Sequence, residues 1–138
     1  MIGAFEVCLP VLRLIASTNA MGRIRTLEIT VRAVDKATIF DLRGSIDLGN
    51  SLVLRNKLFE TLAAASRLAL NMSGVVYLDS SGIATLIEAL KKARDLEKDF
   101  VLFGLGSRVY DVLQMTNLLG VFQIRESEEQ ALEADAAP

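Results

Sequence analysis

Apolar and polar residues alternate in short stretches along this chain, separated by segments in which apolar residues recur at helical spacing. Residues 24–34 alternate with a period of two, which is typical of a half-buried strand. Residues 37–42 resume the alternation after the polar pair Asp35-Lys36. Because a two-residue polar break commonly joins antiparallel strands, the two stretches predict a β-hairpin.

Beyond the hairpin, helix patterns alternate with strand patterns. A turn-rich loop over 44–50 precedes a helix whose leucines recur every fourth residue from Leu54 to Leu62, and Asn50 or Ser51 could cap it. The elements predicted after that helix are a strand over 67–72 that continues over 75–78 after a kink or loop, a helix including 83–93, a strand over 100–103, a helix capped by Ser107, a strand over 121–124, and a helix over 128–134 capped by Ser127.

This order of elements predicts an α/β fold in which most strands are parallel. Strands separated by helices pair in parallel through right-handed crossovers, and the hairpin adds an antiparallel strand at the start. We therefore expect a mixed, mostly parallel sheet of four to five strands with helices packed against it. A chain of 138 residues suits one domain with one core, expected here over residues 23–135.

Residues 1–22 are expected to form an N-terminal extension that need not be ordered. The segment from Met1 to Ala20 is fairly apolar, but no basic region precedes its apolar stretch, so the pattern does not favour a signal peptide. Three interpretations stay open: a flexible or helical extension, an upstream start that is not used, and a segment that binds a partner.

Composition and charge exclude several classes of function. The chain is 51% hydrophobic and 23% charged with a net charge of −2, and it lacks the clustered basic residues of a nucleic-acid-binding protein. It contains no histidine, which excludes histidine-based triads and histidine metal sites. The single cysteine, Cys8, cannot form an intrachain disulfide, and no apolar run is long enough to span a membrane. We therefore expect no membrane insertion and no direct contact with nucleic acid.

Three strand-to-helix junctions are expected at one edge of the sheet, where ligands and partners of open α/β sheets gather. They lie at 44–50, 79–82 and 104–107. The second, Asp79-Ser80-Ser81-Gly82, holds more oxygens than N-capping needs, since one side chain suffices and contributes about 1 kcal/mol. The surplus hydroxyl fits a serine offered to another protein, because a phosphate there is tolerated by its own helix and would repel an acidic partner.

Enzymatic interpretations of these junctions are weaker. Ser80-Ser81-Gly82 matches the second half of a nucleophile elbow, but the first glycine of that motif is missing. Gly104-Leu105-Gly106 lacks the third glycine of a dinucleotide-binding fingerprint, and a tight turn explains it. Asp47 and Asp79 could meet and bind Mg²⁺, although two acids on different loops are a weak signal. A hydrolase that uses Ser80 is the weakest alternative.

Around these junctions, the chain resembles the STAS domain of the anti-sigma factor antagonists. The resemblance rests on VVYLDSSGIATLIEAL at 75–90, LRGSIDLGNS at 42–51 and FVLFGLGSRVYDVLQMTNLLGVFQI at 100–124, and it extends over about residues 24–134. The Asp-Ser-Ser-Gly box is its most specific part. Family members commonly have Gly-Glu-Leu-Asp where this chain has Gly44-Ser45-Ile46-Asp47, so Ser45 replaces the glutamate.

The resemblance implies a STAS fold in a small cytoplasmic protein without catalytic activity or a cofactor of its own. It implies that the unphosphorylated form binds an anti-sigma factor that is also a serine kinase, and so releases a sigma factor. The kinase, which holds the ATP, would phosphorylate Ser80, and a serine phosphatase would restore the active form. The partner-binding residues that it implies are Asp47, Asp79, Ser80, Ser81 and Gly82, with Asp47 close to Ser80.

A second interpretation shares the same fold. The chain would then be a non-catalytic STAS scaffold subunit of a stress-signalling or membrane-transport complex. The Asp79-Ser80 pair favours the phosphorylation switch, whereas the N-terminal extension favours the scaffold.

Overall fold

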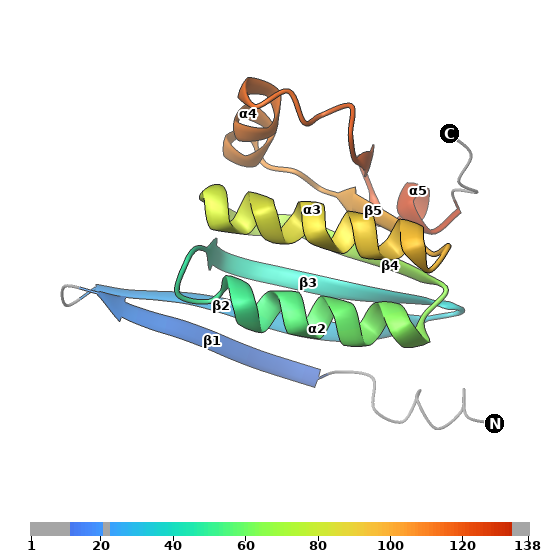
Figure 1. The fold of residues 1–138 in the computed structure, drawn as a ribbon, viewed down its shortest axis with the longest axis horizontal. Helices are drawn as coiled ribbons and strands as arrows, with labels where there is room; N and C mark the ends of the chain where they lie inside the picture. Colours follow the sequence, from blue (N-terminus) through green and yellow to red (C-terminus); the bar gives the residue numbers. More distant parts are fainter. Residues whose placement is uncertain (1–11, 21–22, 134–138) are drawn as a thin grey trace.

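The computed structural model describes residues 12–20 and 23–133, with side chains described from Thr26 onward. Within these residues, the chain forms one six-stranded sheet with four helices (Figure 1). The strands are β1 (Leu12–Ala20), β2 (Arg23–Val34), β3 (Ala37–Ile46), β4 (Arg67–Leu78), β5 (Asp99–Phe103) and β6 (Gln123–Arg125). The helices are α2 (Ser51–Ala64), α3 (Ser80–Asp95), α4 (Ser107–Met115) and α5 (Glu128–Glu133).

The sheet is mixed, and its strands lie in the order in which they occur along the chain. β1, β2 and β3 pair antiparallel, whereas β3, β4, β5 and β6 pair in parallel. The hairpin between β2 and β3 turns at Asp35-Lys36, where Val34 pairs with Ala37. The predicted α/β class, the hairpin and the mostly parallel pairing are therefore confirmed.

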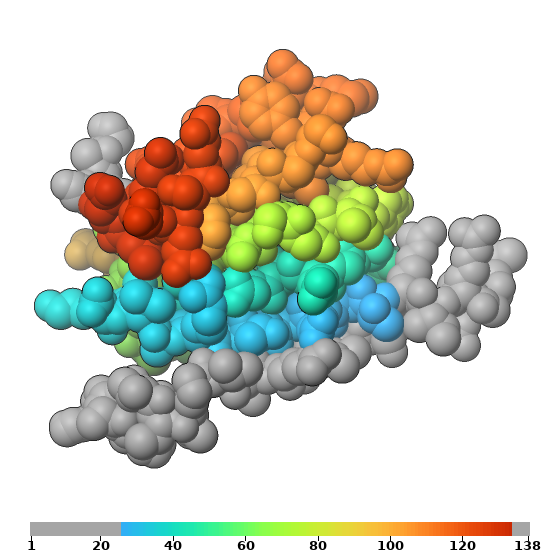
Figure 2. All heavy atoms as spheres, turned by 180° about the vertical axis from the view of Figure 1, so that it is seen from behind, coloured from blue at the N-terminus to red at the C-terminus, as the bar shows by residue number. Residues whose placement is uncertain are grey.

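The two faces of the sheet are covered by different helices. Successive right-handed crossovers in one direction place α2 and α3 on the same face, where they lie side by side (Figure 1). The leucine stripe at 54, 58 and 62 is fully buried there, against strand residues such as Phe40 and Leu70. On the opposite face, a smaller cluster of Ile39, Ala69, Val101, Phe103 and Ala131 lies under α5. Figure 2 shows this back face, with α5 (red) over one end of it.

The N-terminal segment differs from the sequence prediction. Leu12–Ala20 forms β1, an edge strand paired antiparallel with β2, so the sheet has one strand more than the four to five expected. The outer edge of β2 carries backbone N–H and C=O groups that need partners, and a neighbouring strand supplies them. Residues 1–11 and 21–22 of the expected extension lie outside the described residues, so the domain boundary at residue 23 stays a prediction.

Two breaks predicted from the sequence are irregularities inside continuous strands. β3 runs to Ile46, so the loop predicted over 44–50 is shorter, because Gly44 adopts a φ of 112° within the strand. A Cβ atom at Gly44 would lie 2.1 Å from the carbonyl oxygen of Thr26. β4 is likewise one strand, and the predicted kink before residue 75 is a register shift opposite β3. Glycine therefore marks close strand contacts here rather than turns.

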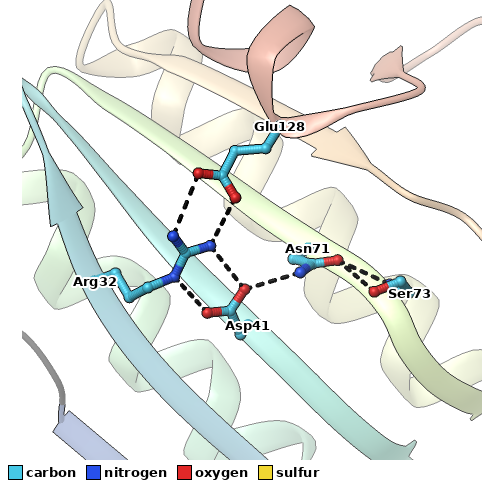
Figure 3. Close-up of polar contacts among 5 residues, drawn as sticks. All are labelled: Arg32, Asp41, Asn71, Ser73 and Glu128. Carbon is cyan, nitrogen blue, oxygen red and sulfur yellow. Dashed lines mark hydrogen bonds and ion pairs between the residues drawn. The ribbon is translucent and has the colours of Figure 1, made fainter.

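An arginine from β2 connects the sheet to α5 (Figure 3). The Nε and Nη2 atoms of Arg32 donate to the Asp41 carboxylate over 2.6 and 3.0 Å, and its Nη2 atom also donates to Glu128 over 2.8 Å. Asn71 donates to the same Asp41 carboxylate over 2.8 Å, and its Oδ1 atom accepts from the backbone and hydroxyl of Ser73 at the bulge. One network thus joins β2, β3, β4 and α5.

The network changes the acidity of Asp41. Partial burial raises the pKa of this carboxyl, but the hydrogen bonds from Arg32 and Asn71 outweigh that effect and hold the pKa below its ordinary value of 3.8. A depressed pKa in the folded state means that Asp41 stabilises the protein above its ordinary pKa, and that this stabilisation is lost as the pH falls towards the folded-state value.

We predict that Asp41→Asn removes part of the acid sensitivity of the fold. The variant is expected to be less stable than wild type at pH 7, and the difference should shrink as the pH falls below about 4. Urea unfolding from pH 7 to pH 3 measures it, with Asp111→Asn, at an exposed carboxylate on α4, as the matched control. A wild-type advantage that stays constant over this range would contradict the assignment.

We also predict that a chain lacking residues 1–22 folds. β1 lies at the edge of the sheet and pairs with β2, and the core among the described side chains begins at Leu27. The truncated chain should unfold cooperatively in urea and lose less than about 2 kcal/mol, the scale of burying one large apolar side chain. A larger loss would show that the N-terminal segment belongs to the core.

Candidate functional site

The ends of β3 and β4 lie side by side, and each leads directly into a helix. Parallel pairing places Ile46, the last residue of β3, beside Leu78, the last residue of β4. The backbone N–H of Asp79 donates to the carbonyl oxygen of Ile46 over 3.2 Å and so joins the two loops that follow. α2 and α3 begin next to each other there, at the left of Figure 1. We call this edge, formed by residues 47–52 and 79–82, the rim.

Asp79 caps α3; the sequence predicts a cap from an aspartate or a serine of this box, and the structure selects the aspartate. Its Oδ1 atom accepts hydrogen bonds from the backbone N–H groups of Ser81 and Gly82, over 2.9 and 3.0 Å. The negative carboxylate also lies favourably at the positive end of the helix dipole. Ser80 is the first residue of the helix and is exposed, whereas Ser81 is half-buried. Of the two adjacent serines, Ser80 is therefore the one that the rim presents to solvent.

Gly82 lets the start of α3 lie directly on the strand ends. A Cβ atom at this buried position would lie 2.5 Å from Cδ1 of Leu78 and 2.9 Å from Cγ2 of Ile46. Contacts this short are essentially never seen, so a side chain at this position would have to displace the side chains of Leu78 and Ile46 or move the helix away from the strand ends. The glycine of the Asp-Ser-Ser-Gly box thus fixes where Ser80 lies relative to β3 and β4.

The loop between β3 and α2 is held by its own side chains. Asp47 is 5% exposed, and its Oδ1 atom accepts from the N–H of Gly49 over 3.0 Å. Asn50 is fully buried, accepts from the N–H of Asp47 over 3.0 Å and donates to the carbonyl of Ser45 over 2.9 Å. Asn50 occupies the N-cap position of α2, but its side chain makes no capping hydrogen bond. The predicted N-cap position is therefore confirmed, but the side chain organises the preceding loop instead of bonding to the first turn of the helix.

The third predicted loop starts lower on the sheet. β5 ends at Phe103, which pairs with Asn71 well before the end of β4. Gly104 then turns with a φ of 71°, close to Asn71 and Ser73. Gly106 takes the N-cap position of α4, so the prediction that Ser107 caps this helix is wrong. The cap predicted at the last helix is present, because Ser127 Oγ accepts from the N–H of Gln130 over 3.2 Å.

The two aspartates of the rim make hydrogen bonds within their own loops. The carboxylates of Asp47 and Asp79 both accept backbone N–H groups of their own loops, which accounts for them without a metal ion. Among the described residues, no group of three histidine, cysteine or acidic side chains is placed to hold a metal. No described helix has the length and apolar character needed to cross a membrane.

Exposed apolar side chains at and near the rim were not anticipated from the sequence. Those with large exposed fractions are Leu48 (79%), Leu52 (65%), Val53 (39%), Val76 (58%) and Tyr77 (40%). In the sequence, Leu48 falls in a predicted loop, Leu52 and Val53 lie beside the leucine stripe of the helix, and Val76 and Tyr77 fall in a predicted strand. Their exposure depends on how the strand ends and helix starts meet, which the local pattern does not encode.

Comparison with known proteins gives consistent results. A family model described as the STAS domain matches residues 28–131 of this chain. A curated relative from Listeria monocytogenes, named anti-sigma-B factor antagonist, is 28% identical over 104 residues, which cover 75% of this chain and 90% of the relative.

Solved structures share the fold. An anti-sigma factor antagonist from Mycobacterium paratuberculosis superposes with a TM-score of 0.71 at 21% identity, covering 83% of this chain and 96% of that one. The anti-sigma factor antagonist SpoIIAA in its unphosphorylated form gives a TM-score of 0.66 at 18% identity, with coverages of 76% and 93%. SpoIIAA of Bacillus in its phosphorylated form gives 0.61 at 17% identity, with coverages of 76% and 96%.

We predict that Gly82→Ala destabilises the domain by about 1–3 kcal/mol, the usual cost of overpacking, although alanine favours helices. The added methyl group must displace either Leu78 or the backbone of β3. Urea unfolding measures the loss. Gly120→Ala is the matched control, because nothing lies within 4 Å of its Cβ position, and it should change stability by less than about 0.5 kcal/mol. Equal stabilities for the two variants would contradict the described approach of α3 to the sheet.

Proposed function

This chain belongs to the STAS domain family, and on that basis we propose that it is an anti-sigma factor antagonist controlled by phosphorylation of Ser80. The observation that carries the proposal is the exposed Ser80, at the first residue of α3 on a rim whose acids are bonded within their own loops. The name of the relative from Listeria monocytogenes, an anti-sigma-B factor antagonist, supports the same class of function.

In this proposal, the unphosphorylated chain binds an anti-sigma factor that is also a serine kinase, and a sigma factor is released. Ser80 forms the contact surface together with Asp79 and Ser81, and the buried Asp47 and Gly82 hold its shape from below. The kinase partner supplies the ATP and transfers a phosphate to Ser80, and a serine phosphatase removes it again. The chain itself acts by binding rather than by catalysis, and it needs no cofactor.

The position of Ser80 explains why the domain would tolerate the phosphate. At the start of α3, a phosphate lies near the positive end of the helix dipole, and an anion at an exposed helix start changes stability by about 0.3–1 kcal/mol in the favourable direction. Because Ser80 is exposed, the phosphate need not displace any buried side chain. The folded state is therefore expected to survive modification.

The effect on the partner would be larger. A phosphoserine adds about 1.5–2 negative charges at neutral pH. A partner surface that fits a neutral hydroxyl must then desolvate these charges, and any carboxylate it places there is repelled. Modification would thus switch binding without unfolding the domain.

We predict that Ser80→Ala abolishes phosphorylation, whereas Ser81→Ala does not. The test incubates wild type and both variants with ATP and each purified anti-sigma factor serine kinase of the source organism, and maps the phosphosite by mass spectrometry. Labelling of Ser80→Ala at the wild-type level would contradict the site.

Protein phosphorylated at Ser80 should bind the same kinase at least tenfold more weakly, which is about 1.4 kcal/mol, with little change in melting temperature.

Calorimetry decides between the switch and its alternative. If phosphorylated and unmodified protein bind equally well, the chain is not a phosphorylation switch, and the scaffold subunit of a stress-signalling or membrane-transport complex becomes the better proposal.

A further inference from the structure

Two leucines at the rim are exposed in a way that the fold does not require. Leu48 lies in the loop before α2 with 79% of its surface exposed, and Leu52 lies in the first turn of that helix with 65% exposed. The next leucine of the helix, Leu54, is fully buried. A single exposed apolar side chain needs no explanation, but a pair on one short segment is typical of a contact surface.

The loop that carries Leu48 has a defined shape. The backbone N–H groups of Asn50 and Ser51 both donate to the carbonyl of Asp47, over 3.1 and 2.9 Å. The buried Asn50 side chain adds two further hydrogen bonds, to the Asp47 N–H and the Ser45 carbonyl. The exposure of Leu48 is therefore a property of a folded turn. A side chain presented by a pre-organised turn loses less conformational entropy when a partner binds it.

The leucines share the rim with Ser80. The two loops are joined by the hydrogen bond from Asp79 to Ile46, and the start of α2 contacts α3 through Thr85 Oγ1, which lies 3.5 Å from the carbonyl of Ser51. The residues between the two leucines are Gly49, Asn50 and Ser51, all uncharged. An uncharged segment with two exposed leucines thus lies on the same rim as Ser80, the proposed phosphorylation site.

We propose that Leu48 and Leu52 form an apolar anchor that inserts into an apolar pocket of the anti-sigma factor, next to its contact with Ser80. This inference rests on the proposed function and extends it to the source of the affinity. The leucines supply the burial that drives association, and Ser80 controls whether the surfaces can close. When the surfaces close, a phosphate on Ser80 loses water and meets no compensating charge in the apolar contact beside it. Phosphorylation therefore weakens the whole contact.

The test uses Leu48→Ala and Leu52→Ala, with Met115→Ala as the matched control. Met115, the last residue of α4, is 80% exposed and lies outside the rim. The probe is each purified anti-sigma factor serine kinase of the source organism that binds the wild-type chain, and the readout is the calorimetric dissociation constant. Each rim variant should bind about tenfold more weakly, whereas Met115→Ala stays within about twofold of wild type.

Three further measurements keep the result specific. All three variants should melt within about 2 °C of wild type, because the side chains removed are exposed. Leu48→Met, which keeps an apolar side chain of similar volume, should bind nearly as well as wild type. Sedimentation of the free chain tests whether a second copy of this chain binds the anchor instead. A dimer that depends on the leucines would overturn the proposal.

The outcomes distinguish failure of the leucine anchor from failure of the proposed function. If wild type binds a kinase and both rim variants bind it equally tightly, the anchor is wrong while the proposed function stands. If wild type binds none of the kinases, the proposed function fails, and an anchor for an anti-sigma factor fails with it.

Discussion

The parallel pairing of β3 with β4 is the constraint on which the rim depends. The pairing runs from Ala37 beside Arg67 to Ile46 beside Leu78, through two register shifts. Because both strands end together, Asp79 can bond to Ile46, and Gly82 can lie against both strand ends. The start of α3 is thereby fixed beside the loop of Asn50. A slip of one residue in this pairing would exchange the buried and exposed sides of the strand ends and separate Ser80 from that loop.

Features that arise from local chemistry could be predicted from the sequence. The leucine stripe of α2 follows helical periodicity, the hairpin follows from a polar pair between alternating stretches, and the capping role of Asp79 follows from an acid at a strand–helix junction. Each depends on residues only a few positions apart. The position of Ser80 at the first residue of α3 follows in turn from the cap.

Features that depend on neighbours in space could not be predicted in the same way. Gly44 is typical of a turn, but here a glycine is needed because β2, a strand earlier in the chain, approaches it closely. Asn50 is typical of a helix cap, but the geometry of its loop directs its side chain towards the Ser45 carbonyl. The exposure of Leu48 and Leu52 likewise results from how two strand ends and two helix starts meet. The apolar character of the N-terminal segment is visible in the sequence, but the pairing of Leu12–Ala20 with β2 depends on the tertiary structure.

The attachment of α5 has a consequence for the order in which the domain assembles. This helix has six residues and is too short to be stable alone. Arg32 holds its first residue, 96 positions away, and Arg67 donates to the carbonyls of Ala131 and Leu132 near its end. Contacts across such separations form late, because the chain must close a large loop before they stabilise it. The face with α2 and α3 can therefore form while the apolar cluster on the back face is still open to water. Docking of α5 closes that cluster last, so during synthesis the back face of the sheet stays exposed until residues 128–133 are available to cover it.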